Sequence, residues 1–108
     1  MSNIFTENAY DIPVDFDQVQ SDWANEGFSF GVFRDPQGQE WNDFIHDTDE
    51  YVLVASGELE IRVGDQVKTV GSGALVRIPR NTFHSLKTLS SAGSVWLYGY
   101  GMWEQANE

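Results

Sequence analysis

Short apolar segments separated by turn residues run through most of the chain, with no sustained helical period between Phe28 and Tyr100. Segments such as Leu59–Val63, in which apolar and charged residues alternate, are typical of strands with one buried face. Glycine, proline and asparagine lie between the segments, at intervals of about 8–12 residues. This spacing predicts an all-β sandwich or small barrel. The expected strands are residues 28–34, 51–56, 59–63, 66–70, 74–78, 83–89 and 95–100.

Two of the expected strands, residues 51–55 and 95–100, are apolar at successive positions. Such strands are covered on both faces. One core in a chain of 108 residues does not easily cover both sides of two strands. We therefore expect a second subunit to supply the outer cover, because cyclic dimers are the commonest oligomers. The alternative is that the N-terminal segment folds back over these strands.

The first 27 residues differ from the rest, with many acidic and few regularly spaced apolar side chains. The alternation of Ile12, Val14 and Phe16 with polar residues predicts an extended segment or edge strand. A short helical turn is expected near residues 17–24. We therefore divide the chain into an N-terminal arm, residues 1–27, and a β-barrel domain, residues 28–108.

The charge of the chain argues against several partners. Seventeen acidic and six basic residues give a formal net charge of −11. Such a surface repels nucleic-acid phosphates and anionic lipid headgroups, so neither nucleic acid nor a membrane is an expected partner. The sequence has no cysteine, which excludes disulfides and thiolate metal sites. The N-terminus lacks the basic start and apolar core of a secretory signal, so we expect a cytoplasmic protein.

Two histidines and a glutamate are candidates for a metal site. His46 and Glu50 are four residues apart, so in an extended segment their side chains point to one face. A bend at residues 47–49 would weaken this inference. His84 lies in a predicted strand, on the same face as Leu86, and a curled sheet would turn it toward the other two groups. Spacing alone leaves a satisfied or solvated histidine as the commoner interpretation.

The segment around His46 resembles the first sequence motif of the cupin superfamily. His46 is followed after three residues by Glu50, and Glu50 after six residues by Gly57. Gly38 stands where the motif opens, six residues before Phe44. Phe44 itself occupies the place of the first motif histidine, and its side chain has no lone pair to donate.

The segment around His84 resembles the second cupin motif. Gly73 is followed after five residues by Pro79, and His84 comes three positions after Asn81. Asn81 replaces a motif glycine, but asparagine also tolerates the left-handed backbone, so the turn is expected to be kept. Thr88 replaces the final asparagine, which is not a metal ligand in the family.

The resemblance implies a small single-domain cupin, an antiparallel double-stranded β-helix or jelly roll. It also implies that His46, Glu50 and His84 bind one divalent metal ion inside the barrel. Two imidazoles and a carboxylate suit iron, manganese, zinc, nickel or copper. Because Phe44 removes a usual ligand, an apolar pocket that has given up its metal remains an alternative.

Trp41 and Phe44 flank the first motif and are expected to line a small-molecule pocket. The resemblance implies that, with a metal ion, the site would serve an oxygenase, an isomerase or a lyase. Without one, it would suit a non-catalytic binding or sensor module. Because a fold does not specify a function, the sequence leaves open whether the protein is an enzyme and which substrate it takes.

Overall fold

The computed structural model describes residues 4–103. The first three residues of the predicted arm and the last five of the predicted barrel domain lie outside the described residues. The division at residue 27 stays a prediction. The elements are, in chain order, β1 (Phe5–Thr6), α1 (Phe16–Asn25), β2 (Gly31–Asp35), β3 (Glu40–Phe44), β4 (Asp49–Ser56), β5 (Leu59–Val63), β6 (Gln66–Val70), β7 (Leu75–Ile78), β8 (His84–Thr88) and β9 (Ser94–Gly101).

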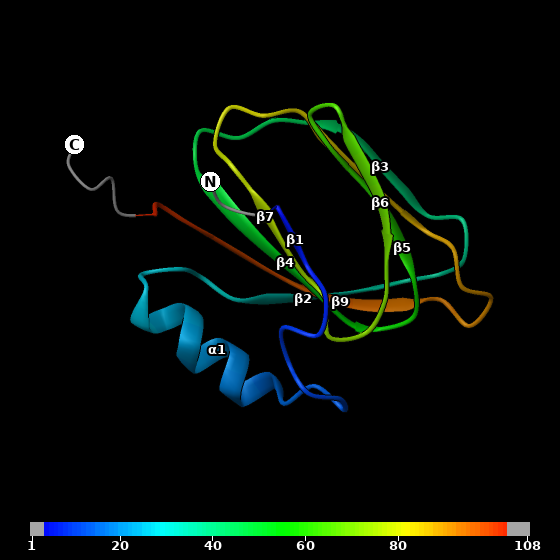
Figure 1. The fold of residues 1–108 in the computed structure, drawn as a ribbon, viewed down its shortest axis with the longest axis horizontal. Coiled ribbons are helices and arrows are strands. Elements are labelled where there is room, and N and C mark those ends of the chain that lie inside the picture. The colour runs from blue at the N-terminus through cyan, green and yellow to red at the C-terminus, as the bar shows by residue number, and fades with distance from the viewer. Residues whose placement is uncertain (1–3, 104–108) are drawn as a thin grey trace.

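The strands form two antiparallel sheets that face each other (Figure 1). One sheet has the order β1-β7-β4-β9-β2, and the other has the order β3-β8-β5-β6. Except for the β5–β6 hairpin, neighbours in each sheet are not consecutive in sequence, as β4 pairs with both β7 and β9. The chain passes repeatedly from one sheet to the other, as in a jelly roll. This arrangement confirms the predicted all-β fold.

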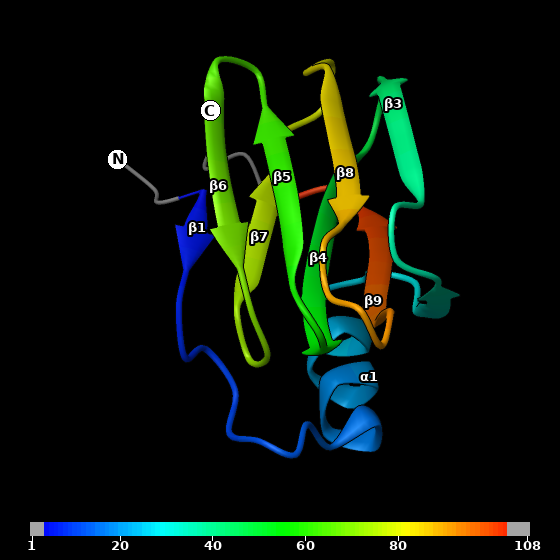
Figure 2. The ribbon, with the colours of Figure 1, turned by 90° about the vertical axis from the view of Figure 1, so that its right-hand side faces the viewer.

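The interior between the sheets is filled by alternate residues of the strands. In β5, Leu59, Ile61 and Val63 are buried, whereas Glu60 and Arg62 point to solvent. Figure 2 shows β5, β6 and β8 in front of the sheet that contains β4 and β7. The strands predicted at 59–63 and 66–70 are confirmed. The first predicted strand begins later than expected, at Gly31, because Phe28 packs beneath the helix and the backbone N–H of Phe28 bonds to the Trp23 carbonyl.

The apolar outer face of the five-stranded sheet is covered by the chain itself. Val19 and Trp23 of α1 are buried against a cluster that includes Leu53 of β4 and Leu97 of β9. Figure 1 shows the helix on the side of this sheet that faces away from the second sheet. The expectation that a second subunit supplies this cover is therefore wrong, and the folded-back N-terminal segment is the observed solution.

The strand expected from the alternation of Ile12, Val14 and Phe16 is also wrong. Phe16 begins a ten-residue helix, longer than the single turn expected near residues 17–24. The Asp15 carboxylate accepts a hydrogen bond from the backbone N–H of Gln18, 3.2 Å away, and so caps the free N–H groups of the first turn. In the part of the chain that the structure describes, no helix has the length and hydrophobicity to cross a membrane.

Candidate metal centre

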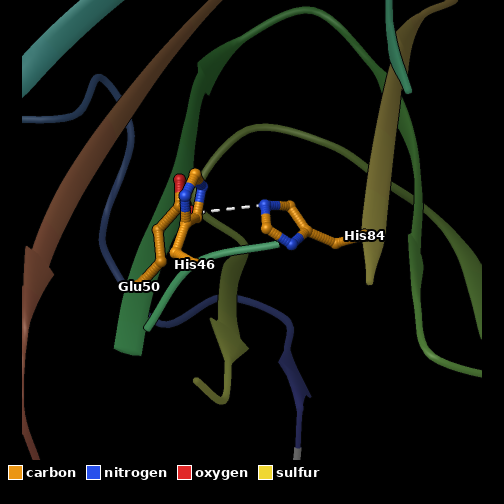
Figure 3. A group of neighbouring side chains, drawn as sticks. All are labelled: His46, Glu50 and His84. Atoms are coloured by element: carbon orange, nitrogen blue, oxygen red, sulfur yellow. Dashed lines mark ion pairs between the residues drawn. The ribbon is translucent and has the colours of Figure 1, made fainter. Parts of the chain in front are cut away.

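His46, Glu50 and His84 meet inside the barrel, as their motif positions imply. One candidate ligand atom from each lies within 4.8 Å of the others. Glu50 comes from β4, His84 opens β8 on the opposite sheet, and His46 precedes β4. Figure 3 shows His84 pointing across the interior toward the other two side chains. These three groups could hold a metal ion.

The route by which His46 reaches the site differs from the extended segment assumed from its spacing. The chain bends at Asp47 and Thr48, and β4 begins only at Asp49. The His46 carbonyl accepts a hydrogen bond from the backbone N–H of Asn81, 2.6 Å away, which joins the two motifs. Asn81 has a φ of 60°, so the left-handed turn expected at this position is kept.

Glu50 is the most informative member of the group. Its Oε1 lies 3.3 Å from His84 Nε2 and 3.6 Å from His46 Nε2. Neither contact has the geometry of a hydrogen bond, and this buried oxygen has no hydrogen-bond partner among the described residues. A buried carboxylate oxygen without a partner costs free energy, which a positive ion between the three groups would relieve. Two atoms each about 2.1 Å from one ion lie up to about 4.2 Å apart, so both separations fit a shared ion.

The ring of His84 is oriented for ligation by a hydrogen bond on its far side. Its Nδ1 lies 3.1 Å from the Thr82 carbonyl oxygen, which can only accept, so Nδ1 carries the proton. In the neutral imidazole, the lone pair of Nε2 is then directed at Glu50 and His46, the usual arrangement of a metal-ligating histidine. Burial lowers the pKa of His84, but the Glu50 carboxylate and the Thr82 carbonyl raise it more, so the net direction is upward.

Trp41 and Phe44 both line the cavity beside this cluster. They are three residues apart, a spacing that would place them on opposite faces of a regular strand. The pairing of β3 with β8 shifts between them, so that Trp41 lies opposite Leu86 and Phe44 opposite His84. Asp43 absorbs the extra residue with a φ of 60°, and this β-bulge turns both rings inward.

Sequence reasoning missed several cavity residues or gave them a different role. Trp96 and Tyr100 lie in the continuous apolar strand expected at residues 95–100, a pattern that predicts core or interface positions. Both line the cavity, because alternate residues of β9 point into the barrel. Phe33 of the edge strand β2 also lines it, although nothing in its sequence context indicated a site.

Two buried carboxylates behind the site were also missed. Asp49 is 2% exposed and accepts hydrogen bonds from the backbone and side chain of Arg80 and from the Trp103 backbone. Burial raises the pKa of Asp49, but the bonds from Arg80 and Trp103 outweigh it and lower the pKa overall. Asp35 accepts from the indoles of Trp41 and Trp96. The chain has 17 acidic residues, and nothing in the sequence distinguishes Asp35 or Asp49 from the solvent-exposed ones.

The family follows from a comparison of the whole domain. The sequence model described as the cupin domain matches residues 31–100, more than half of the chain. The chain is a cupin. No curated protein matches its sequence.

Several solved cupins share the fold at low sequence identity. The cupin domain of Schizosaccharomyces pombe Cnp3 superposes with a TM-score of 0.66 at 18% identity, over 69% of this chain and 56% of that one. An RmlC-like cupin from Shewanella frigidimarina gives 0.65 at 15% identity, over 73% and 69%. An RmlC-like cupin of Methanocaldococcus jannaschii with a double-stranded β-helix fold gives 0.63 at 14% identity, over 69% and 70%. This cupin thus spans little more than half of the first of these chains, and the likeness shows the fold.

Proposed function

We propose that this cupin binds one divalent transition-metal ion through His46, Glu50 and His84, and that the adjoining cavity takes a small molecule. The observation that supports this most is the buried Oε1 of Glu50, which has no hydrogen-bond partner among the described residues and lies between two imidazoles. Iron, manganese, zinc, nickel and copper all accept this ligand set. Three protein ligands leave coordination positions open, as in catalytic rather than structural sites.

When bound, such an ion supplies Lewis-acid or oxygen-activating chemistry. The chain's own residues hold and orient the reactants. His84 is fixed by its bond to the Thr82 carbonyl, and Trp41 and Phe44 supply apolar walls for the cavity beside the site. An oxygenase, an isomerase or a lyase reaction each fits this arrangement.

The metal is tested by purifying the protein without chelator, loading it with each candidate ion and measuring metal per chain. We expect one ion per chain in the wild type. Glu50→Gln and His84→Ala should each lose most of it, because each removes a ligand. Glu60→Gln is the matched control, since Glu60 is exposed on β5. Retention of the metal by both site variants would remove the proposal.

Binding of a small molecule without metal is the second candidate, and Phe44 is the observation that favours it. Its ring stands 6.3 Å from the His46 ring and 6.1 Å from the His84 ring, where the resembled motif has a ligand. On this alternative, a ligand would raise the melting temperature of metal-stripped protein as much as that of loaded protein.

Three further expectations from the sequence stay predictions. The cytoplasmic location and the absence of nucleic-acid and membrane partners rest on sequence signals and on the net charge of −11. The sequence argument for a homodimer was that a second subunit covers the outer face of β4 and β9. That argument no longer applies, because α1 covers this face. A dimer would therefore form through another surface, and light scattering on the purified protein measures it directly.

A further inference from the structure

The cavity beside the candidate metal ligands is small, and its walls are made almost wholly of rings. Its volume is about 120 Å³. Apart from the three candidate ligands, Leu86 is the one lining residue that is not aromatic, and no lysine or arginine of the described residues lines it. The cavity therefore offers flat apolar contact and no fixed positive charge of its own.

Five rings that line the cavity form a closed cycle of contacts together with the ring of Tyr98, which does not line it. Consecutive ring centroids lie 5.0–6.3 Å apart, within the range of favourable aromatic contacts. Such mutual packing leaves each ring little room to turn, so the cavity keeps its shape without a ligand. In order, the members of this ring cycle are Phe33, Trp41, Phe44, His46, Tyr100 and Tyr98, which contacts Phe33 again.

A single carboxylate oxygen fixes the two indoles of the cavity relative to each other. The Nε1–H groups of Trp41 and Trp96 both donate to Oδ2 of Asp35, each at 2.9 Å. Asp35 is 9% exposed, and the ring of Phe33 contacts both indoles. Because the two bonds converge on one atom, neither indole can move without breaking a bond to a buried charge. Asp35 thus acts on a ligand only through the tryptophans, as a positioning residue.

The size of the cavity limits the ligand to one ring. An apolar cavity of about 150 Å³ lined by aliphatic and aromatic side chains holds one benzene molecule. This cavity has about 120 Å³, and it opens to solvent beside Phe44, which is 37% exposed. A single six-membered ring can enter with a substituent in the mouth, whereas two fused rings exceed the space.

The charge of the loaded site selects the polar group of the ligand. A divalent ion held by one carboxylate and two neutral imidazoles leaves about one unit of positive charge at the end of the cavity. An oxygen donor that can carry negative charge balances it, and a cationic group is repelled. This step rests on the proposed function.

We propose that the cavity takes a single six-membered aromatic or conjugated ring bearing one oxygen donor that points at Glu50, His46 and His84, and that Asp35 sets this size limit by holding Trp41 and Trp96. The ring part of the proposal depends on the ring cycle. The oxygen part depends on the metal.

The test is calorimetric titration of metal-loaded and metal-stripped protein with phenol, toluene, 2-naphthol and tetramethylammonium, after metal per chain has been measured. In loaded protein, phenol should bind at least about tenfold more tightly than toluene or 2-naphthol, a difference of about 1.4 kcal/mol. Tetramethylammonium should not bind. After metal removal, phenol should fall to the affinity of toluene.

The variant Asp35→Leu tests the positioning role. It should weaken phenol and toluene alike, on the order of tenfold, and leave metal per chain unchanged. Asp35→Asn keeps an acceptor oxygen for the indoles and should restore most of the affinity. If Asp35→Leu does not fold, Trp41→Phe removes one of the two anchored N–H groups and should relax the preference for phenol over 2-naphthol. Phe83→Ala is the control, since Phe83 is exposed and does not line the cavity.

Failure of this inference is distinct from failure of the metal site. Stoichiometric metal with no binding of either single-ring probe overturns the inference and keeps the metal. Equal affinity for 2-naphthol and phenol, or tighter binding of tetramethylammonium, also overturns it. Absent metal, with phenol and toluene bound equally and both weakened by Asp35→Leu, overturns the proposed function and the oxygen part, while it supports the ring part.

Discussion

At the scale of single residues, Phe44 stands at the position where the resembled first motif has a histidine. Its ring centroid lies 6.3 Å from that of His46 and 6.1 Å from that of His84, and its side chain lines the cavity. On the proposed metal site, the aromatic side chain would supply an apolar wall where a histidine would supply a fourth ligand. Metal affinity and room for an apolar small molecule would therefore place opposite demands on position 44.

We expect Phe44→His to bind metal more tightly than the wild type, on the order of tenfold, and to bind phenol more weakly. The added imidazole supplies a ligand, and the cavity loses part of its ring cycle. Competition with a coloured chelator measures the metal affinity. Phe44→Leu, which restores no ligand, serves as the control, and equal metal affinity in the two variants would contradict the prediction.

Asp49 makes a second prediction at this scale, since its buried carboxylate is paired with Arg80 at 3.0 Å directly before Glu50. Its folded pKa is lowered, so its contribution to the free energy of unfolding is present above the unfolded pKa, about 3.9, and is lost as pH falls. We expect Asp49→Asn to lose about 1–3 kcal/mol at neutral pH and less in acid. Urea unfolding at several pH values measures this.

The matched control for Asp49 is the pair of Lys87 with Glu40, which is exposed on both sides at 3.9 Å. Lys87→Gln should change stability little, because solvent screens such pairs. A loss for Asp49→Asn that stayed constant down to acid pH would contradict the assigned role.

At the scale of elements, most of the strands could be predicted from sequence because alternation and turn residues are local signals. The convergence of His46, Glu50 and His84 was also predictable, through the resemblance to two spaced motifs. The bulge at Asp43 was not, because its effect depends on the partner strand β8. Trp41 and Phe44 were expected at the site, but the sequence does not indicate that both lie on one face of β3. Residues three apart in a regular strand lie on opposite faces.

The sequence does contain signals for helix α1, but other features of the same segment favoured an extended structure. Phe16, Val19 and Trp23 have helical spacing, and Asp15 with Gln18 has the spacing of a capping box. The many acidic side chains and the alternation before Phe16 favoured an extended arm. Tertiary packing decides the outcome, because Trp23 becomes buried against β4 only after the sheet exists.

The contact between α1 and β9 gives the prediction at this scale. A Cβ at Gly99 would lie 2.2 Å from the Ser29 carbonyl oxygen and 2.7 Å from the Trp23 ring. We expect Gly99→Ala to lose about 1–3 kcal/mol of unfolding free energy, because the backbone of Ser29 cannot yield cheaply. Gly71→Ala should be near neutral, since the nearest atom to its added Cβ is 3.9 Å away. Equal stability of the two variants would show that the helix is not seated this closely.

At the scale of the whole molecule, the candidate metal centre joins the two sheets. Glu50 belongs to the five-stranded sheet and His84 to the four-stranded one. An ion between them would connect the layers at one end of the barrel, while the interior apolar cluster holds them together along the rest. Metal content and global stability are therefore expected to be linked.

We expect metal removal to lower the free energy of unfolding by about 2.7 kcal/mol when free metal had been at about 100 times its dissociation constant. The difference should shrink as pH falls. Because the pKa of His84 is raised, protons compete with metal at Nε2 below that value, and the same protonation stabilises the metal-stripped protein against Glu50. Thermal melts of both forms between about pH 8 and pH 6, around the ordinary histidine pKa, measure the difference. A stability difference between the metal-loaded and metal-stripped forms that increased as pH fell would contradict His84 as a metal ligand.

The placement of the tryptophans on two sides of one sheet gives the molecule a built-in optical readout. Trp41 and Trp96 face the cavity, with their N–H groups fixed by Asp35, whereas Trp23 lies in the helix on the opposite side, and Trp103 packs against the same cluster as Trp23. Indole emission from the first pair would report filling of the barrel by a quenching metal or an aromatic guest. Emission from Trp23 would report loosening of the helix. Single Trp→Phe replacements would separate the two signals, so that occupancy and local unfolding could be followed in one cuvette without an added dye.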